Sequence, residues 1–242
     1  MILRKSALKL ATVATHILPK KVKDFLLKVE YRNISYSQEG EDLILARIFG
    51  EKKNGRFVDV GAHHPKKYSN TYKFYLSGWR GINIDAMPGS MISFQKYRPE
   101  DINIEAGVAC NKGELTYYIF NEPALNTFDK VEAGKKDGKN GYTILRKIKV
   151  NVLPLAEILD QYLAPTDPID FLTIDVEGLD FEVIQSNNWN VYRPKVVLIE
   201  ELRNIQGENN NKISAFLVEK GYELIAKTYN TLIFKDTSYN LN

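Results

Sequence analysis

The chain has 242 residues, of which 44% are hydrophobic and 26% are charged, and its formal net charge is +3. A chain of this size can bury roughly 70% of its unfolded surface as one compact domain. The net charge is too small to indicate nucleic acid as a partner, and no zinc-finger spacing is present. The single cysteine, Cys110, excludes an internal disulfide and favours a reducing compartment, so we expect a cytoplasmic protein.

The first 34 residues are basic and amphipathic. Apolar residues recur there at helical spacing, with basic residues between them. The apolar run is shorter than the roughly 20 residues of a membrane span, and it lacks a signal-peptide cleavage site. We therefore predict a helical arm over residues 1–34 that packs on the domain or on a second subunit, which leaves a homo-oligomer open. Contact with a membrane surface is the alternative.

Strand-like and helix-like stretches alternate from residue 35 onward, and we expect one domain over residues 35–242. Apolar residues at helical spacing predict helices over residues 40–50, 69–79, 88–99, 155–163, 180–189 and 212–221. Apolar runs predict strands over residues 55–61, 80–86, 102–109, 114–120, 145–152, 169–178 and 195–201, with two more in residues 222–236. Residues 121–142 are polar and glycine-rich, which predicts a long mobile loop.

This alternation predicts an α/β fold, in which a mostly parallel sheet of about seven strands has helices on both faces. The last two strands are separated by a short turn, which predicts an antiparallel hairpin at one edge. Such a hairpin is associated with methyltransferase sheets rather than with dehydrogenase sheets. Ligands of these sheets bind beyond the carboxyl ends of the strands, where residues 59–61, Asp85 and residues 175–178 are expected to lie.

The turn after the first strand lacks the G-x-G-x-x-G pattern of a dinucleotide site. Only Gly61 is present, and His63 and Pro65 stand where further glycines are expected. A ligand without a pyrophosphate, such as S-adenosylmethionine, fits this turn better, which disfavours a dehydrogenase. Asp85 is then placed to accept hydrogen bonds from ribose hydroxyls. The alternative is that Asp59 and Asp85 only cap the helices that follow them.

Several separated blocks of the sequence resemble the FkbM-type methyltransferases. The blocks are residues 36–49 (YSQEGEDLILARIF), 55–91 (beginning GRFVDVGAHHPKKYSNT), 98–105 (RPEDINIE) and 170–200 (beginning DFLTIDVEGLDFEVIQ). Together they cover most of residues 36–201 and occur in the family's order. The resemblance implies a class I, Rossmann-like fold that uses S-adenosylmethionine. It also implies methyl transfer to a hydroxyl, often on a sugar of a surface polysaccharide or glycolipid.

The resemblance also implies roles for individual residues. Asp59 and Gly61 match the cofactor turn, and Asp85 matches the ribose acceptor. Two pairs are further cofactor candidates: Gln38 and Glu39, from a segment that similar enzymes fold over the cofactor, and Ser69 and Asn70, which open the next helix. Ordinary helix capping is an equal alternative for Ser69 and Asn70.

The D-x-E-G motif of residues 175–178 is expected to lie near the two adjacent histidines. This topology places Asp175 and Glu177 beside His63 and His64, and these four residues are our catalytic candidates. We predict a divalent cation, Mg²⁺, Mn²⁺ or Fe²⁺, held by a set consisting of His64, Asp175, Glu177 and Glu200. The alternative is a metal-free site in which one histidine is a general base and Asp175 orients it.

The sequence thus predicts an S-adenosylmethionine-dependent O-methyltransferase. Its expected substrate is a hydroxyl of a nucleotide-linked sugar or of a glycan, in the biosynthesis of a surface polysaccharide. Two alternatives stay open: methylation of a non-sugar metabolite by a metal-free histidine base, and a module that binds the cofactor without catalysis. Trp79 and Trp189 are expected to belong to the core rather than to a sugar-binding surface.

Overall fold

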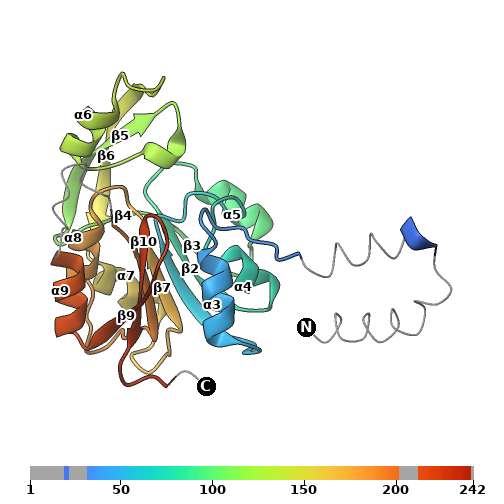
Figure 1. The fold of residues 1–242 in the computed structure, drawn as a ribbon. Helices are drawn as coiled ribbons and strands as arrows, with labels where there is room; N and C mark the ends of the chain where they lie inside the picture. Colours follow the sequence, from blue (N-terminus) through green and yellow to red (C-terminus); the bar gives the residue numbers. More distant parts are fainter. Residues whose placement is uncertain (1–18, 22–31, 202–211, 241–242) are drawn as a thin grey trace.

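The computed structural model describes residues 19–21, 32–201 and 212–240 (Figure 1). Most of the predicted arm over residues 1–34 lies outside the described residues. The remaining chain forms a large sheet with helices on both faces and, above it in Figure 1, a smaller sheet with its own helix.

The large sheet has seven strands in the order β3-β2-β1-β7-β8-β10-β9. The first five strands in this order are parallel to one another, whereas β10 runs antiparallel to both β8 and β9. This topology confirms the predicted class I architecture and its antiparallel hairpin at one edge. The strands are β1 (Arg56–Val60), β2 (Arg80–Asp85), β3 (Ile102–Glu105), β7 (Phe171–Ile174), β8 (Val196–Glu200), β9 (Tyr222–Lys227) and β10 (Thr231–Asp236).

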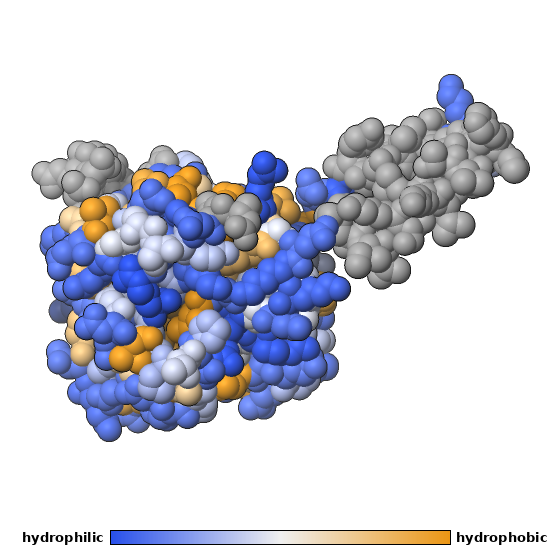
Figure 2. All heavy atoms as spheres, turned by 90° about the horizontal axis from the view of Figure 1, so that it is seen from below, coloured by the Kyte–Doolittle hydropathy of each residue, from blue (hydrophilic) through white to orange (hydrophobic). Residues whose placement is uncertain are grey.

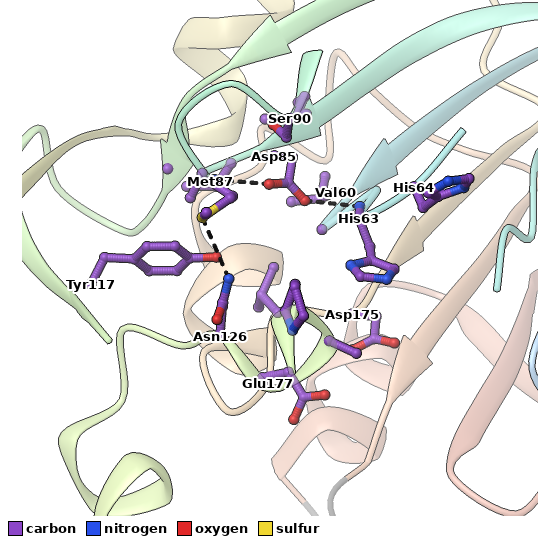
Figure 3. Close-up of a pocket in the computed structure, with 18 of the residues that line it drawn as sticks. Val60, His63, His64, Asp85, Met87, Ser90, Tyr117, Asn126, Asp175 and Glu177 are labelled. Carbon is purple, nitrogen blue, oxygen red and sulfur yellow. Dashed lines mark hydrogen bonds between the residues drawn. The ribbon is translucent and has the colours of Figure 1, made fainter. Parts of the chain in front are cut away.

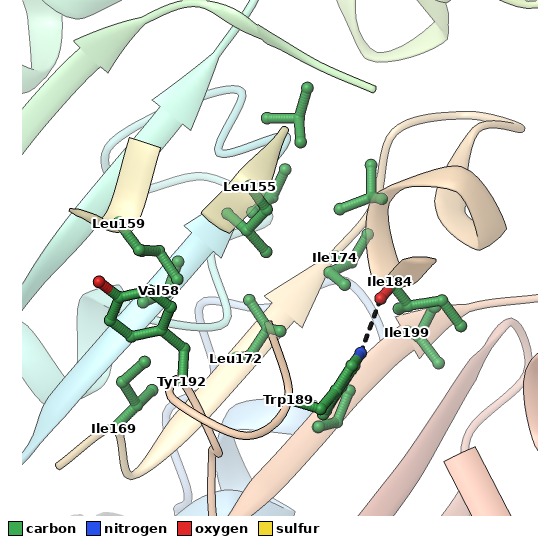
Figure 4. Packing of buried hydrophobic residues seen from close by; sticks show 14 of the residues in the cluster. Val58, Leu155, Leu159, Ile169, Leu172, Ile174, Ile184, Trp189, Tyr192 and Ile199 are labelled. Atoms are coloured by element: carbon green, nitrogen blue, oxygen red, sulfur yellow. Dashed lines mark hydrogen bonds between the residues drawn. The ribbon is translucent and has the colours of Figure 1, made fainter. Parts of the chain in front are cut away.

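Helices cover both faces of this sheet because its central strands are apolar on both sides. Along β7, Leu172 packs into one core cluster together with Trp189 (Figure 4), and Phe171 packs into the cluster on the opposite face together with Trp79. Both tryptophans are therefore core residues, as predicted. The helices are α3 (Glu41–Phe49), α4 (Tyr72–Leu76), α5 (Met91–Tyr97), α7 (Leu155–Tyr162), α8 (Asp180–Gln185) and α9 (Lys212–Glu219).

A second sheet of three strands, in the order β4-β6-β5, was not predicted from the sequence. Its strands are β4 (Gly107–Val108), β5 (Gly113–Phe120) and β6 (Ile144–Leu153). The stretch predicted as one strand over residues 102–109 is split, because β3 belongs to the large sheet and β4 to the small one.

The prediction of a long loop over residues 121–142 is wrong. This segment contains the 3₁₀ helix η1 (Pro123–Leu125) and the α-helix α6 (Lys130–Lys136). The side chain of Asp129 accepts hydrogen bonds from the backbone N–H groups of Val131 and Glu132, which caps α6. Ala133 is fully buried and packs against Tyr118 and Phe120. Capping and this tertiary contact stabilise a helix despite the glycine-rich sequence.

Hydrophilic residues cover most of the face seen from below in Figure 2, and apolar residues form small separate groups on it. Within the described part of the chain, no helix is long and apolar enough to span a membrane.

Candidate active site

A pocket of about 370 Å³ lies at the carboxyl ends of β1, β2 and β7. This is the position at which sheets of this topology bind their ligands. Figure 3 shows how side chains from the three strand ends, and from the small sheet, converge on it. The pocket brings together seven of the predicted site residues: Gln38, Gly61, His63, His64, Asp85, Asp175 and Glu177.

Gly61 allows the ends of β1 and β7 to approach each other closely. Its φ angle is 83°, and a Cβ atom added there would lie 1.8 Å from the carbonyl oxygen of Asp175. The N–H group of Asp175 donates to the carbonyl of Val60, which extends the pairing of the two strands to this point. Glycine is therefore required here by contact between backbones, in addition to any role in binding a cofactor.

Asp85 holds two of the turns that surround the pocket. Its Oδ2 atom accepts a hydrogen bond of 2.8 Å from the N–H of His63, and its Oδ1 atom accepts one of 2.8 Å from the N–H of Met87. Burial raises the pKa of Asp85, although these two hydrogen bonds counteract the effect. A carboxylate has about four lone-pair sites, so Asp85 keeps capacity to bind a ligand in the pocket.

The two histidines have different surroundings. His63 has a φ angle of 52°, in the left-handed region, and its ring is directed toward the side of the pocket that holds Asp175 (Figure 3). His64 points away from Asp175 in the same view, and its Nδ1 atom accepts hydrogen bonds of 3.0 Å from the N–H groups of Lys66 and Lys67. Partial burial, with the positive charges of its neighbours, lowers the pKa of His64. Because Nδ1 accepts these hydrogen bonds, the proton of the neutral His64 ring lies on Nε2.

This geometry corrects one member of the predicted metal set. Each of Asp175, Glu177 and Glu200 offers a carboxylate oxygen that lies within 4.8 Å of the others, and no histidine belongs to this group of described residues. His64 is excluded because its Nδ1 lone pair is engaged with backbone N–H groups. His63 is the histidine that faces the carboxylates.

Glu200 is the most buried member of the carboxylate group. Only 8% of it is exposed, and among the residues that the structure describes, none donates a hydrogen bond to its Oε2 atom. Burial, together with the negative charges of Asp175 and Glu177, raises the pKa of Glu200 to about 11. Burial and the charges of Glu177 and Asp180 raise the pKa of Asp175 as well, although Asp175 is accessible from the pocket. Carboxylates this close to one another require a proton or a cation between them.

The turn that carries Glu177 is held by residues that the sequence analysis missed. The carboxylate of Asp180 accepts hydrogen bonds of 3.1 Å from the N–H groups of Val176 and Gly178, and burial raises its pKa to about 7. The hydroxyl of Thr127 donates to the carbonyl of Glu177, whose φ angle is 56°. An acidic residue at the start of the helix that follows D-x-E-G was the signal for Asp180. Thr127 had no such signal.

Asp59 does not line the pocket, although it was predicted to bind the cofactor. It shares a face of β1 with Phe57, whereas Val60 borders the pocket. Its Oδ2 atom accepts a hydrogen bond of 2.7 Å from the hydroxyl of Thr71. Burial raises the pKa of Asp59 to about 6. Asp59 therefore belongs to a buried polar network beside the pocket.

Ser69 and Asn70 also lie outside the lining of the pocket. The hydroxyl of Ser69 accepts a hydrogen bond of 3.0 Å from the N–H of Tyr72, the first residue of α4. The side-chain amide of Asn70 donates to the hydroxyl of Thr173 in the neighbouring strand β7. Ser69 therefore stabilises the start of α4, and Asn70 fixes it to the sheet.

Glu39 likewise does not line the pocket, whereas its neighbour Gln38 does. The Oε2 atom of Glu39 accepts a hydrogen bond of 2.9 Å from the N–H of Asn230, in the turn between β9 and β10. Glu39 thus anchors the segment that brings Gln38 to the pocket.

The comparisons with known proteins agree with this architecture. Residues 59–224 match the family model described as the methyltransferase FkbM domain, which is more than half of the chain. The chain belongs to the FkbM methyltransferase family. Membership of the FkbM family implies S-adenosylmethionine-dependent methyl transfer. A comparison with curated proteins finds no match.

Solved methyltransferase structures resemble this FkbM protein only distantly. Methyltransferase FkbM from Methylobacillus flagellatus is 11% identical, with a TM-score of 0.48, over 75% of this chain and 43% of that one. Precorrin-6Y C5,15-methyltransferase from Geobacter metallireducens is 11% identical, with a TM-score of 0.41, over 80% and 84% of the two chains. A TehB-like methyltransferase from Corynebacterium glutamicum is 9% identical, with a TM-score of 0.37, over 90% and 96%. The assignment therefore rests on the family match.

The FkbM match includes most of the residues that surround the pocket. It begins at Asp59 and extends beyond Glu200, and it contains the whole of the small sheet and α6. Gln38 lies before it, on the segment that α3 follows.

Proposed function

We propose that this FkbM protein is an S-adenosylmethionine-dependent O-methyltransferase that acts on a hydroxyl of a nucleotide-linked sugar or of a glycan, in the biosynthesis of a surface polysaccharide, with the assistance of a divalent cation. One observation carries the proposal. A single pocket is lined both by Asp85, at the end of β2, and by Asp175 and Glu177, beyond the end of β7. Groups suited to a nucleoside and groups suited to an acidified hydroxyl therefore lie in the same cavity.

The pocket is suited to S-adenosylmethionine. Its volume of about 370 Å³ lies within the range of small-molecule sites, roughly 300–1,000 Å³. Asp85 would hold the ribose hydroxyls, and the apolar side chains of Ile84, Val108 and Phe128 would face the adenine. When bound, S-adenosylmethionine would supply an electrophilic methyl group.

The carboxylates are suited to a divalent cation. Oxygen ligands from Asp, Glu and water are those that Mg²⁺ and Mn²⁺ prefer. The Oε2 atom of Glu200 is buried within this group without a donor among the described residues, which is the second observation in favour of a cation. A sugar hydroxyl is nearly as weak an acid as water, and a strong metal centre lowers the pKa of bound water from 15.7 to about 7.

His63 is the residue placed to accept the proton that the hydroxyl must lose. Its ring is directed to the side of the pocket where Asp175 lies (Figure 3). The transfer forms one carbon–oxygen bond, breaks one carbon–sulfur bond and releases this single proton. If methyl transfer needs no cation, His63 would act as the general base that deprotonates the acceptor hydroxyl.

Methyl incorporation from labelled S-adenosylmethionine into nucleotide sugars and glycan fragments tests this proposal. We expect a product only with such acceptors, loss of activity with a chelator, and recovery with Mg²⁺, Mn²⁺ or Fe²⁺. Full activity in exhaustively chelated protein would remove the cation and leave His63 as the base. Methylation of non-sugar alcohols alone would overturn the carbohydrate assignment. Failure to bind S-adenosylhomocysteine in calorimetry would overturn the enzymatic role itself.

A further inference from the structure

Glu177 already has a positively charged partner in this protein. The Nζ atom of Lys136, at the end of α6, lies 2.5 Å from Glu177 Oε2. Both side chains are less than one-fifth exposed, at 19% and 18%, so solvent screens this pair only in part. The charge of Lys136 opposes the effect of burial on the pKa of Glu177, and it acts in the same direction on Glu200. Lys136 therefore places a positive charge directly beside the carboxylate group.

The same ion pair joins α6 to the D-x-E-G turn. Ala133 fixes the middle of α6 in the small apolar cluster beside β5. A Cβ atom added at Gly178 would lie 3.0 Å from Glu132 Cγ, so α6 packs closely on this turn. A helix of seven residues has little stability of its own, and its last turn leads into a glycine-rich stretch. The contact between Lys136 and Glu177 is therefore the charged link that holds this last turn over the carboxylates.

We propose that Lys136 and a divalent cation are alternative partners of Glu177, so that binding of the cation releases Lys136 and loosens the last turn of α6. This inference rests on the cation site of the proposed function. An ammonium group and a divalent ion repel each other when they share one carboxylate. The cation gains all three carboxylates, including the buried oxygen of Glu200, which Lys136 does not reach among the contacts described. Lys136 thus determines how strongly an ion must bind in order to replace it at Glu177.

Titration of the full chain with Mn²⁺, followed by electron paramagnetic resonance of the free ion, tests this competition. Lys136→Met should lower the dissociation constant for Mn²⁺ by about tenfold. Lys135→Met is the matched control, because Lys135 is the preceding residue, is 53% exposed and pairs with Glu132 instead. We expect its dissociation constant to equal that of the wild type.

Equal Mn²⁺ affinity in the wild type and in Lys136→Met would overturn the competition and leave the cation site standing. An equal gain in Lys135→Met would also overturn it, because the effect would then be a general consequence of net charge. Absence of Mn²⁺ binding in all three proteins would overturn both the competition and cation assistance. Calorimetry with S-adenosylhomocysteine on the same samples reports separately on the cofactor site.

Amide hydrogen exchange in α6 provides a second measurement, which a change in net charge alone would not alter. Saturating Mn²⁺ should speed amide exchange over residues 134–138 in the wild type. Lys136→Met should show this faster exchange with and without the ion. Tight Mn²⁺ binding with unchanged exchange in α6 would overturn the release of the helix.

Discussion

Two aspartates at opposite ends of β7 have opposite electrostatic surroundings. Asp170 directly precedes the strand, and its carboxylate accepts hydrogen bonds from the side chains of Lys52 and Lys195 and from the N–H of Arg56. Burial alone would raise the pKa of Asp170, but the hydrogen bonds from the two lysines outweigh it and lower the pKa. Asp175 directly follows the same strand, and burial beside Glu177 and Asp180 raises its pKa.

The contrast indicates that Asp170 stabilises the fold, whereas Asp175 belongs to a functional site. At the amino end of β7, Lys52 and Lys195 neutralise the negative charge of Asp170, so the carboxylate contributes to the stability of the fold. At the carboxyl end, Asp175, Glu177 and Glu200 concentrate negative charge, which is unfavourable for folding and is typical of functional sites. Substitutions at the two ends of β7 should therefore have opposite consequences for stability.

The largest effect is expected from removing carboxylates at the carboxyl end. Asp175→Ala or Glu177→Ala should lower the methyl-transfer rate by at least about 100-fold, because a ligand of the proposed cation is lost. Initial rates with labelled S-adenosylmethionine, with and without Mn²⁺, measure this. Glu201→Gln is the control, since Glu201 pairs with Lys227 outside the carboxylate group. Retention of ion-stimulated activity in Asp175→Ala would contradict the functional role of this end of β7.

Removing the carboxylate at the amino end should lower stability instead. Asp170→Ala is expected to reduce the free energy of unfolding by about 2–3 kcal/mol, because Lys52, Lys195 and a backbone N–H lose their partner. Urea denaturation measures this. Asp175→Asn should leave the free energy of unfolding unchanged or raise it, since it removes repulsion. An equal loss of stability in the two variants would remove the contrast.

The pH dependence of stability has a definite sign at Asp170. Its pKa is lower in the folded protein than in the unfolded chain, so the unfolded state binds the proton more tightly. The stabilisation is therefore complete above the unfolded pKa, near 3.9, and is lost as the pH falls through the folded pKa. Asp170→Ala should show a smaller decline in stability with acid than the wild type does.

Cofactor binding should distinguish Asp85 from Asp59. Asp85→Ala is expected to weaken S-adenosylhomocysteine binding by about 1.5–3 kcal/mol, the size of a hydrogen bond to a charged group. Asp59→Asn should spare binding, because the carboxylate of Asp59 faces Thr71 and can be replaced by an amide oxygen. Isothermal titration calorimetry measures both. Equal losses in the two variants would return Asp59 to the set of cofactor residues.

The sequence was sufficient to predict the large sheet and the edge at which the site lies. Apolar periodicity located its strands, and the rule for parallel sheets placed Asp85 and Asp175 at one edge. The sequence was insufficient to predict α6, because this helix is stabilised by a tertiary contact, between Ala133 and residues of β5. It was also insufficient for β4, whose two residues are too short to show a period.

Side-chain direction limited the prediction of the site in a similar way. Side chains alternate between the two faces of a strand, so the sequence could have shown that Asp59 shares a face of β1 with Phe57 rather than with Val60. For the histidines no such pattern exists, since the left-handed backbone of His63 turns two adjacent side chains in different directions. The sequence therefore located this turn correctly and left open which imidazole faces the carboxylates.

The smallest effect is expected at His64, which organises the turn without contributing to the carboxylate group. His64→Ala should reduce the free energy of unfolding by about 1 kcal/mol, because the N–H groups of Lys66 and Lys67 lose their acceptor near a surface where water can replace it. His64→Asn should recover most of this loss, since its side-chain oxygen can occupy the position of Nδ1. Neither variant should alter the dissociation constant for Mn²⁺.

His63→Asn provides the comparison, because asparagine tolerates the left-handed backbone that His63 adopts. Its stability should equal that of the wild type, whereas its methyl-transfer rate should fall, because the group that receives the proton is lost. Loss of Mn²⁺ binding in His64→Ala, with binding intact in His63→Asn, would restore His64 as the ligand and contradict the direction that we assign to the two rings. The opposite pattern would make His63 a ligand of the cation instead of the residue that receives the proton.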